Sequence, residues 1–250
     1  MQNKLKKKLA AIISSLYFKD DKHSFALTYH SVNNTKNNLT SKIYQLDERE
    51  FIDQINFLIN KNIQFKKPSN LFEEDRGCLI TFDDGYKSII KNALDFLNKK
   101  NIPYILFVCP SKLLSNSKDY MSLIELKELV NMENVYVGSH SYNHIKLNEL
   151  EEKKIISELK DSKNFLEQKL SVEVNTISYP FGAIDSRVLK IAEEIGYNSG
   201  FSTKFDFIKQ GYNKLNLPRV DVWDGDNLKI FKNKVIGKWN WMRFFSKYQI

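Results

Sequence analysis

Short apolar runs alternate with amphipathic stretches along most of the chain. The runs have the length of buried strands, and the stretches between them repeat apolar residues at helical spacing. Strands are predicted at residues 25–30, 78–82, 104–109, 135–138, 176–179, 199–201 and 217–222. Helices are predicted at residues 47–60, 86–100, 122–131, 147–170 and 186–195, with a last helical segment beyond residue 222.

This alternation predicts the fold class. Strands that alternate with helices form parallel βαβ units, and their regular spacing indicates an α/β protein whose sheet wraps like a barrel. No linker or shift in composition divides the chain. We therefore expect a single domain at residues 23–225, between a basic amphipathic segment at 1–22 and a basic aromatic segment at 226–250.

Composition narrows the class of protein. The 250 residues are 42% hydrophobic and 27% charged, which is ordinary for a folded domain and excludes a collagen-like or wholly disordered chain. Cys78 and Cys109 are too few for a disulfide framework, so free thiols are expected. The net charge of +8 favours acidic partners in general. Because no nucleic-acid module accompanies that charge, it indicates a solvated lysine-rich surface, and no nucleic-acid partner is expected.

Both ends of the chain combine basic and apolar residues. Near the N-terminus, lysines flank a helical face made of Leu5, Leu9, Ile12, Ile13, Leu16 and Tyr17. Near the C-terminus, basic residues mix with Trp239, Trp241, Phe244 and Phe245. Both patterns are typical of membrane-interface segments, and helices packed on the domain are the alternative. No convincing export signal or spanning run occurs, so we expect a cytoplasmic protein with peripheral contact to the inner membrane face.

Polar and ionisable residues follow the predicted strands at the ends where parallel α/β folds place their active sites. They are His30, Asp83-Asp84-Gly85, residues 139–144, Pro180-Phe181-Gly182 and residues 221–224. Because parallel strands all end at the same edge of a sheet, we expect these residues to gather there.

His140 and His144 are four residues apart, a spacing that would place both rings on one face of a helical turn. A carboxylate from Asp83 or Asp84 would complete a metal site with two histidines and one carboxylate, leaving positions for water and substrate. The adjacent carboxylates could then divide the work, one binding the ion and the other accepting a proton from water. A turn with a helix cap is the alternative for Asp83-Asp84-Gly85.

Three motifs built from these residues resemble those of the polysaccharide deacetylase family, the NodB-homology group of carbohydrate esterase family 4. They are Thr81-Phe82-Asp83-Asp84-Gly85, His140-Ser141-Tyr142-Asn143-His144 and Tyr179-Pro180-Phe181-Gly182. The resemblance covers residues 25–225 and implies a deformed (β/α) barrel, a divalent cation that is usually zinc, and deacetylation of N-acetylglucosamine-type sugars.

The resemblance also implies roles for individual residues. It matches Asp84, His140 and His144 to the metal ligands and Asp83 to the general base. The remaining motif, made of Tyr179, Pro180, Phe181 and Gly182, matches the substrate groove, in which the backbone N–H of Phe181 helps to bind the oxyanion.

Two departures from the family pattern point to one subgroup. The arginine that usually orients the base is replaced by Ser178, and no histidine follows residue 144 to serve as the general acid. Both departures resemble the circularly permuted subgroup that deacetylates poly-N-acetylglucosamine, in which the acid histidine lies on an N-terminal strand. His30 fits that place, and the alternative is a ring bonded to a neighbouring carbonyl. Arg219 is the candidate to replace the missing arginine, with an ion pair to Asp221 or Asp224 as the alternative.

The sequence therefore predicts a metal-dependent hydrolase that removes the N-acetyl group from an amino sugar in surface polysaccharide biosynthesis. A lipid-linked saccharide would be a natural substrate. One alternative is a hydrolase of the same fold that acts on a formamide or a non-sugar amide. Another is a catalytically silent glycan-binding relative, although neither a metal ligand nor the base is lost here.

Overall fold

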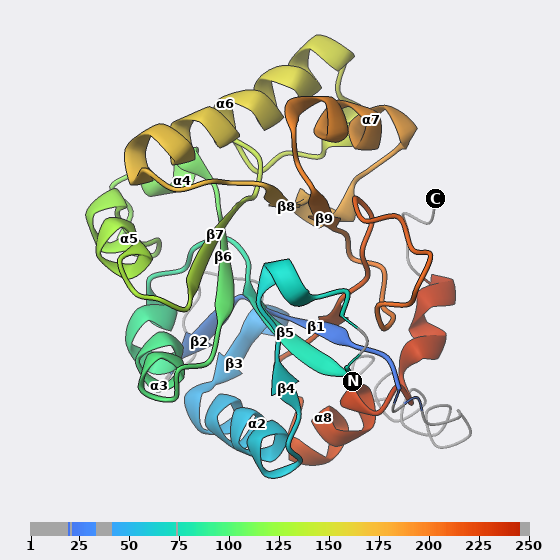
Figure 1. The fold of residues 1–250 in the computed structure, drawn as a ribbon. Coiled ribbons are helices and arrows are strands. Elements are labelled where there is room, and N and C mark those ends of the chain that lie inside the picture. Colours follow the sequence, from blue (N-terminus) through green and yellow to red (C-terminus); the bar gives the residue numbers. More distant parts are fainter. Residues whose placement is uncertain (1–19, 21, 34–41, 74, 246–250) are drawn as a thin grey trace.

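Strands and helices alternate along the chain (Figure 1), and the computed structural model describes residues 20, 22–33, 42–73 and 75–245. The amphipathic face predicted at residues 5–17 lies outside the described residues. The strands are β1 (Phe25–Tyr29), β2 (Ser31–Asn33), β3 (Gln45–Asp47), β4 (Gln64–Phe65), β5 (Gly77–Phe82), β6 (Tyr104–Val108), β7 (Val135–Ser139), β8 (Thr176–Ser178), β9 (Ser199–Phe201) and β10 (Val220–Asp221). The α-helices are α2 (Glu48–Asn60), α3 (Asp95–Lys99), α4 (Pro110–Leu113), α5 (Leu123–Val130), α6 (Glu152–Leu170), α7 (Ser186–Ile195) and α8 (Leu228–Val235).

Eight of the described strands form one parallel sheet. Its order is β10, β1, β5, β6, β7, β8 and β9, with β4 paired to the start of β5. The segment beyond β9 joins the two edges, because Leu217 pairs with Phe201 of β9 while Val220 of β10 pairs with Leu27 of β1. The sheet therefore curls on itself into the deformed barrel that the sequence predicts.

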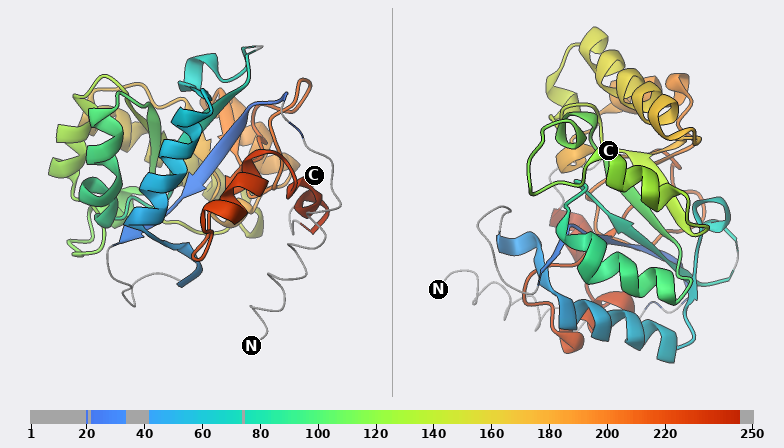
Figure 2. Two further views of the ribbon diagram at one scale, coloured as in Figure 1. Left: turned by 90° about the horizontal axis from the view of Figure 1, so that it is seen from below. Right: turned by 90° about the vertical axis from the view of Figure 1, so that its left-hand side faces the viewer.

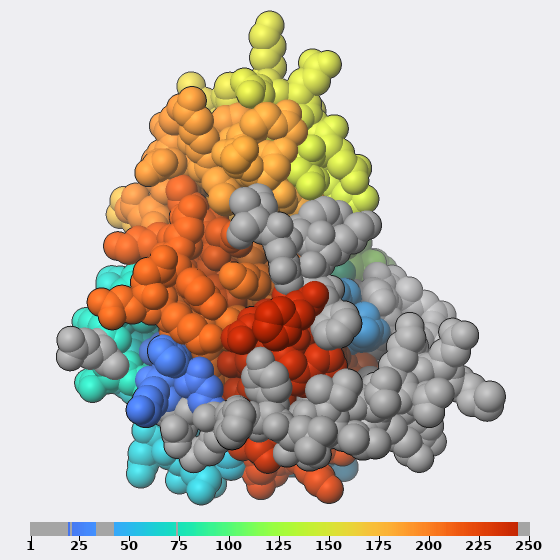
Figure 3. Space-filling view, turned by 90° about the vertical axis from the view of Figure 1, so that its right-hand side faces the viewer, coloured from blue at the N-terminus to red at the C-terminus, as the bar shows by residue number. Residues whose placement is uncertain are grey.

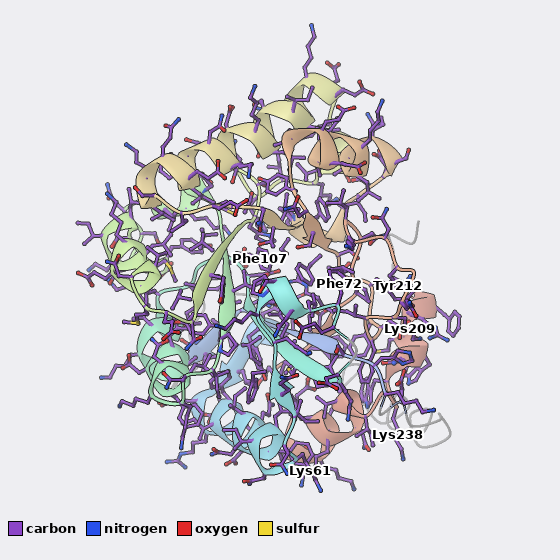
Figure 4. The ribbon with its side chains drawn as sticks, in the orientation of Figure 1. Lys61, Phe72, Phe107, Lys209, Tyr212 and Lys238 are labelled. Carbon is purple, nitrogen blue, oxygen red and sulfur yellow. The ribbon has the colours of Figure 1, made fainter. Side chains whose placement is uncertain are left out.

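Side chains alternate between the inside of the curled sheet and its helix-covered outside. The inner cluster is apolar and consists of Ala26, Leu71, Leu79, Ile105, Phe107, Phe201, Ile208 and Leu217. Phe107 lies near the centre of the molecule (Figure 4), and Gly138 on β7 leaves room for its ring, because a Cβ at Gly138 would lie 2.3 Å from Phe107 Cε1. Since apolar side chains fill the barrel, its reactive groups lie at the rim.

Helices cover the outside of the sheet (Figures 1 and 2). α6 packs against α7 along one side, and α2 packs against α8 along the other. Local sequence sets the ends of these helices. The Asp47 carboxylate accepts a hydrogen bond from the backbone N–H of Arg49 at the start of α2, and the Asp185 carboxylate accepts one from Val188 at the start of α7. Gly196 ends α7 in the left-handed conformation.

Two helices, α3 and α6, begin later than predicted. Instead of starting a helix, Tyr86 forms a backbone bridge and a ring stack with Tyr120, and a π-helical turn, Ile90–Leu94, precedes α3. Leu150 is extended ahead of α6, and its carbonyl oxygen accepts a hydrogen bond from Arg187. In both places a tertiary contact overrides the local helical pattern.

The C-terminal segment packs on the barrel. Trp239 is buried with its ring 6.3 Å from that of Trp223, and Arg243 Nη1 lies 3.2 Å from the buried carboxylate of Asp206. Figure 3 shows this segment, in red, against the orange residues that precede it. Phe244 is 65% exposed. Within the described residues, no helix combines the length and apolar character needed to cross a bilayer. The two cysteines are buried and free, as predicted.

Candidate metal centre and active site

Three of the predicted residues meet at the rim of the barrel with metal-ligand geometry. Asp84 follows β5, and His140 and His144 follow β7. Asp84 Oδ1 lies 3.0 Å from His144 Nε2 and 3.7 Å from His140 Nε2, and one donor atom from each residue lies within 4.8 Å of the others. Two imidazole nitrogens and one carboxylate oxygen suit zinc and leave positions for water and substrate.

A loop, and not the predicted helical turn, brings the two histidines together. The segment after β7 is irregular, and both Ser141 and His144 adopt positive φ angles, 58° and 57°. Glu158 of α6 holds this loop, because its buried carboxylate accepts hydrogen bonds from the backbone N–H groups of Tyr142 and Asn143. The loop directs both imidazoles toward Asp84, with 4.9 Å between the ring centroids.

Backbone strain concentrates at this site. Asp84 and Phe181 also have positive φ angles, 73° and 60°, and for a bulky residue such as Phe181 this conformation is an outlier. The other described residues with positive φ are glycines, asparagines and the helix-capping Ser171. Such conformations persist only where the surroundings enforce them, and they cluster at functional sites.

His140 is prepared to bind a cation through one nitrogen. Its Nδ1 lies 2.6 Å from the carbonyl oxygen of Ser178, which fixes Nδ1 as the donor and leaves Nε2 directed at Asp84. Burial lowers the pKa of His140 to about 4 against the opposing charge of Asp83. The ring is therefore neutral at neutral pH, the form in which histidine coordinates metals.

Asp83 is buried and held at both carboxylate oxygens. Arg219 Nη1 donates to Asp83 Oδ1 and Nη2 to Oδ2, each at 2.8 Å. Ser178 Oγ donates to the same Oδ2 at 2.9 Å and accepts from Arg219 Nη2 at 2.8 Å. Arg219 precedes β10 in the closing segment, and β1 alone lies between β10 and β5 in the sheet, so its guanidinium reaches the carboxylate from two strands away. Arg219 therefore donates its hydrogen bonds to the carboxylate of Asp83 and not to Asp221 or Asp224, which were the alternative partners.

The surroundings keep both adjacent aspartates ionised. Burial alone would raise the pKa of Asp83, but the Arg219 guanidinium outweighs it and holds that pKa well below its usual range. Burial likewise acts to raise the pKa of Asp84, and the hydrogen bond from His144 with nearby positive charges lowers it well below its usual range. Both carboxylates are therefore anionic at neutral pH, as a metal ligand and a proton acceptor must be.

His30 directly follows β1 at the same rim. Its ring stacks on Tyr44, with 4.2 Å between centroids and an interplanar angle of 30°. Its Nδ1 is buried and has no hydrogen-bond partner among the described residues, so the alternative of a carbonyl-bonded Nδ1 is not observed.

The predicted groove motif divides into one exposed residue and three buried ones. Phe181 is 51% exposed, and its ring centroid lies 4.8 Å from that of His144. The side chains of Tyr179 and Pro180 lie in the core, and Gly182 packs against Thr203, where a Cβ would lie 2.2 Å from Oγ1. The buried residues Tyr179, Pro180 and Gly182 support the turn that exposes Phe181, and substrate binding by this motif stays a prediction.

Lys112 and Glu158 are site residues that sequence reasoning missed. Lys112 Nζ lies 2.5 Å from Asp84 Oδ1, on α4 after β6. Since β6 lies between β5 and β7 in the sheet, a residue just beyond it belongs to the same rim. That position was the available signal for Lys112. Glu158 lies inside a long amphipathic helix, where no local pattern marks it.

Comparisons with known proteins agree with this geometry. The profile of the family described as polysaccharide deacetylase matches residues 70–200. A Bacillus subtilis (strain 168) protein named as a polysaccharide deacetylase, YxkH, is 30% identical over 162 residues, which are 65% of this chain and 55% of that protein. The poly-beta-1,6-N-acetyl-D-glucosamine N-deacetylase of Staphylococcus aureus (strain MSSA476) is 26% identical over 230 residues, 80% of this chain and 79% of that protein.

Solved structures share the fold. The Streptococcus pyogenes deacetylase PplD, in complex with acetate, superposes with a TM-score of 0.77 at 19% identity, covering 85% of this chain and 97% of that one. IcaB from Ammonifex degensii superposes with a TM-score of 0.75 at 22% identity, covering 88% of this chain and 98% of that one. The family resemblance of the three motifs and the predicted barrel are thereby confirmed.

The pairing of Arg219 with Asp83 predicts a pH-dependent loss of stability. Arg219→Gln should lower the free energy of unfolding at pH 7 by about 3–5 kcal/mol, because Asp83 remains buried without its cation. The depressed pKa of Asp83 in the wild type contributes stability above its unfolded pKa, and this is lost as pH falls through the folded pKa. In Arg219→Gln the pKa of Asp83 rises. The difference in the free energy of unfolding between the wild type and this variant should therefore become smaller from pH 7 to pH 4.

Urea unfolding at both pH values measures this difference. The exposed Arg49 of α2 offers a matched control, since Arg49→Gln should change the free energy of unfolding by less than about 0.5 kcal/mol. A constant difference between wild type and Arg219→Gln across this range would contradict the argument.

Proposed function

Because the chain belongs to the polysaccharide deacetylase family, we propose that it hydrolyses the N-acetyl group of an N-acetylated amino sugar in a poly- or oligosaccharide with the help of a divalent cation, zinc being favoured. The observation that carries the proposal is the meeting of Asp84, His140 and His144 beside the Asp83–Arg219 pair at one rim. The Staphylococcus aureus relative, named for a poly-N-acetylglucosamine substrate, supports this substrate class and a place in surface polysaccharide biosynthesis.

Asp84, His140 and His144 would hold the cation in this proposal. When bound, a divalent cation polarises the acetyl carbonyl and makes a water molecule more acidic. The neutral form of His140 and the ionised form of Asp84 are those needed for coordination.

Asp83 is the proposed general base. Arg219 and Ser178 fix both of its oxygens, so the carboxylate keeps one orientation toward the water that attacks the acetyl carbon. The same arginine makes Asp83 a weak base, and it can take a proton effectively only from water whose acidity has been raised. Asp83 therefore depends on the cation that the metal centre would hold, because that cation would make the water acidic enough to lose a proton to so weak a base.

Two further groups complete the proposed reaction. The backbone N–H of Phe181 would donate to the oxyanion that forms from the acetyl carbonyl, and the contact of the Phe181 ring with that of His144 places this residue beside the metal centre. His30 would deliver a proton to the departing amine, which leaves poorly until it is protonated. The stack on Tyr44 restricts rotation of the imidazole. Acetate and a free amino sugar are the products.

An assay of acetate release from N-acetylated oligosaccharides tests the function. The full chain should release acetate, a chelator should abolish release, and added zinc or cobalt should restore it. Saccharide binding without acetate release would instead support a silent glycan-binding relative. Release of formate from an N-formyl sugar, or hydrolysis of non-sugar amides alone, would support the other hydrolases of this fold.

Substitutions at the rim should separate metal binding from turnover. Asp83→Asn should lower kcat by about 10²–10⁴-fold while zinc remains bound, because Asp83 acts on the water and not on the ion. His140→Ala should lose zinc itself. Metal content of the purified variants, measured beside acetate release, distinguishes the two classes, and loss of zinc from Asp83→Asn would refute the division of roles.

We also propose peripheral contact with the inner face of the cell membrane, through the basic and aromatic segments near the two termini, and a lipid-linked saccharide as substrate. The exposed Phe244 beside Arg243 supports such contact, whereas Trp239 is committed to the core. Co-sedimentation with anionic vesicles should retain the full chain and release a Phe244→Ser/Arg243→Ser variant in part, because the apolar and electrostatic contributions to binding both fall. Equal retention of the two proteins at low salt would count against contact by the C-terminal segment.

A further inference from the structure

Lys112 contacts the carboxylate oxygen around which the metal centre is built. Its Nζ lies 2.5 Å from Asp84 Oδ1, the atom that is also 3.0 Å from His144 Nε2. The Lys112 side chain is 16% exposed and that of Asp84 is 9% exposed, so water screens the pair poorly. The ammonium group of Lys112 therefore contacts the oxygen that a divalent cation at this site would need as a ligand.

Two tyrosines hold Lys112 in this place. The rings of Tyr86 and Tyr120 stack with 5.1 Å between centroids, and Lys112 Nζ lies 5.0 Å from the centroid of Tyr120 and 5.9 Å from that of Tyr86. The two residues also form a backbone bridge, and Met121 N donates to Gly85 O. The aromatic pair is thus fastened to the turn that carries Asp84, and Lys112 is a built part of the site.

Without a metal, Lys112 compensates Asp84. A buried carboxylate that lacked a cation would destabilise the fold, and the ammonium supplies the missing positive charge. When a metal ion is bound, the same ammonium group is a like charge that repels the ion, and the two compete for contact with Asp84 Oδ1. Its effects on the metal-free and metal-loaded proteins therefore have opposite signs.

We propose that Lys112 and the divalent cation are alternative partners of Asp84, so that metal loading displaces the ammonium and Lys112 sets the metal affinity of the site. Such coupling is reciprocal, since metal binding weakens the contact of Lys112 with Asp84 by the same factor by which that contact weakens metal binding. Tyr86 and Tyr120 offer the displaced ammonium a cation–π surface beside the site.

A supporting role of Lys112 predicts the opposite result. If the lysine stayed bound to Asp84 and oriented it toward the metal, its loss would weaken metal binding by about 10–100-fold, as removal of an orienting partner usually does. Competition predicts tighter binding. The sign of the change in affinity therefore decides between the two roles, and it does not depend on whether the protein deacetylates any sugar.

Zinc affinity of Lys112→Met provides this test. The full-length protein is stripped of metal, and zinc binding is measured at one fixed pH by competition with a chromophoric chelator. We expect Lys112→Met to bind zinc at least about tenfold more tightly than the wild type, because the competing charge is removed while an apolar stem of similar length remains. The metal-free variant should melt below the metal-free wild type, and zinc should raise its melting temperature by more.

Lys87→Met is the matched control. Lys87 lies near Asp84 in the sequence, but its Nζ is 2.7 Å from Glu125 Oε1 and its side chain is 50% exposed, so its loss should leave zinc affinity within about threefold. Lys112→Gln retains a hydrogen-bond donor without the charge and should bind zinc with intermediate affinity, which provides a second test if the methionine variant folds poorly. Unchanged or weaker zinc binding by a folded Lys112 variant would overturn the proposal.

Discussion

A buried ion pair between Arg219 and Asp83 ties the chemistry of this protein to the closure of its barrel. The segment that carries Arg219 pairs with β9 on one side and β1 on the other, and the guanidinium binds both oxygens of a carboxylate at the end of β5. Neither charge can remain buried alone without a large cost. One segment therefore both joins the sheet edges and orients the carboxylate, and Ser178 of β8 hydrogen-bonds to both partners of the ion pair.

The sequence allowed most of the fold to be predicted because buried parallel strands leave continuous apolar runs. β5, β8 and β9 lie where such runs predicted them, and Asp47 and Asp185 mark helix starts by side-chain capping. Predictions were wrong where a distant partner decides the local structure. The start of α3 depends on Tyr120, which is far from Tyr86 in the chain and lies beyond β6.

The site was predictable to the extent that its groups lie in short motifs. Asp84, His140 and His144 could be chosen as ligands, but the helical-turn argument for the histidines was wrong, because positive φ angles in the loop cannot be inferred from spacing. Lys112 joins the site through the order of strands, and Glu158 through the packing of α6 on the loop after β7. Neither the order of the strands nor the packing of α6 on this loop produces a periodic or local pattern in the sequence.

The position of Arg219 after the other site residues has a consequence for biosynthesis. A ribosome releases His30, both aspartates and both histidines well before this arginine, and until then the sheet has unjoined edges and Asp83 lacks its cation. A nascent polypeptide therefore contains Asp84, His140 and His144 before the cationic partner of Asp83 has been made. The pairing of Asp83, and with it the joining of β9 to β1, has to wait until the segment around Leu217 and Arg219 has left the ribosome.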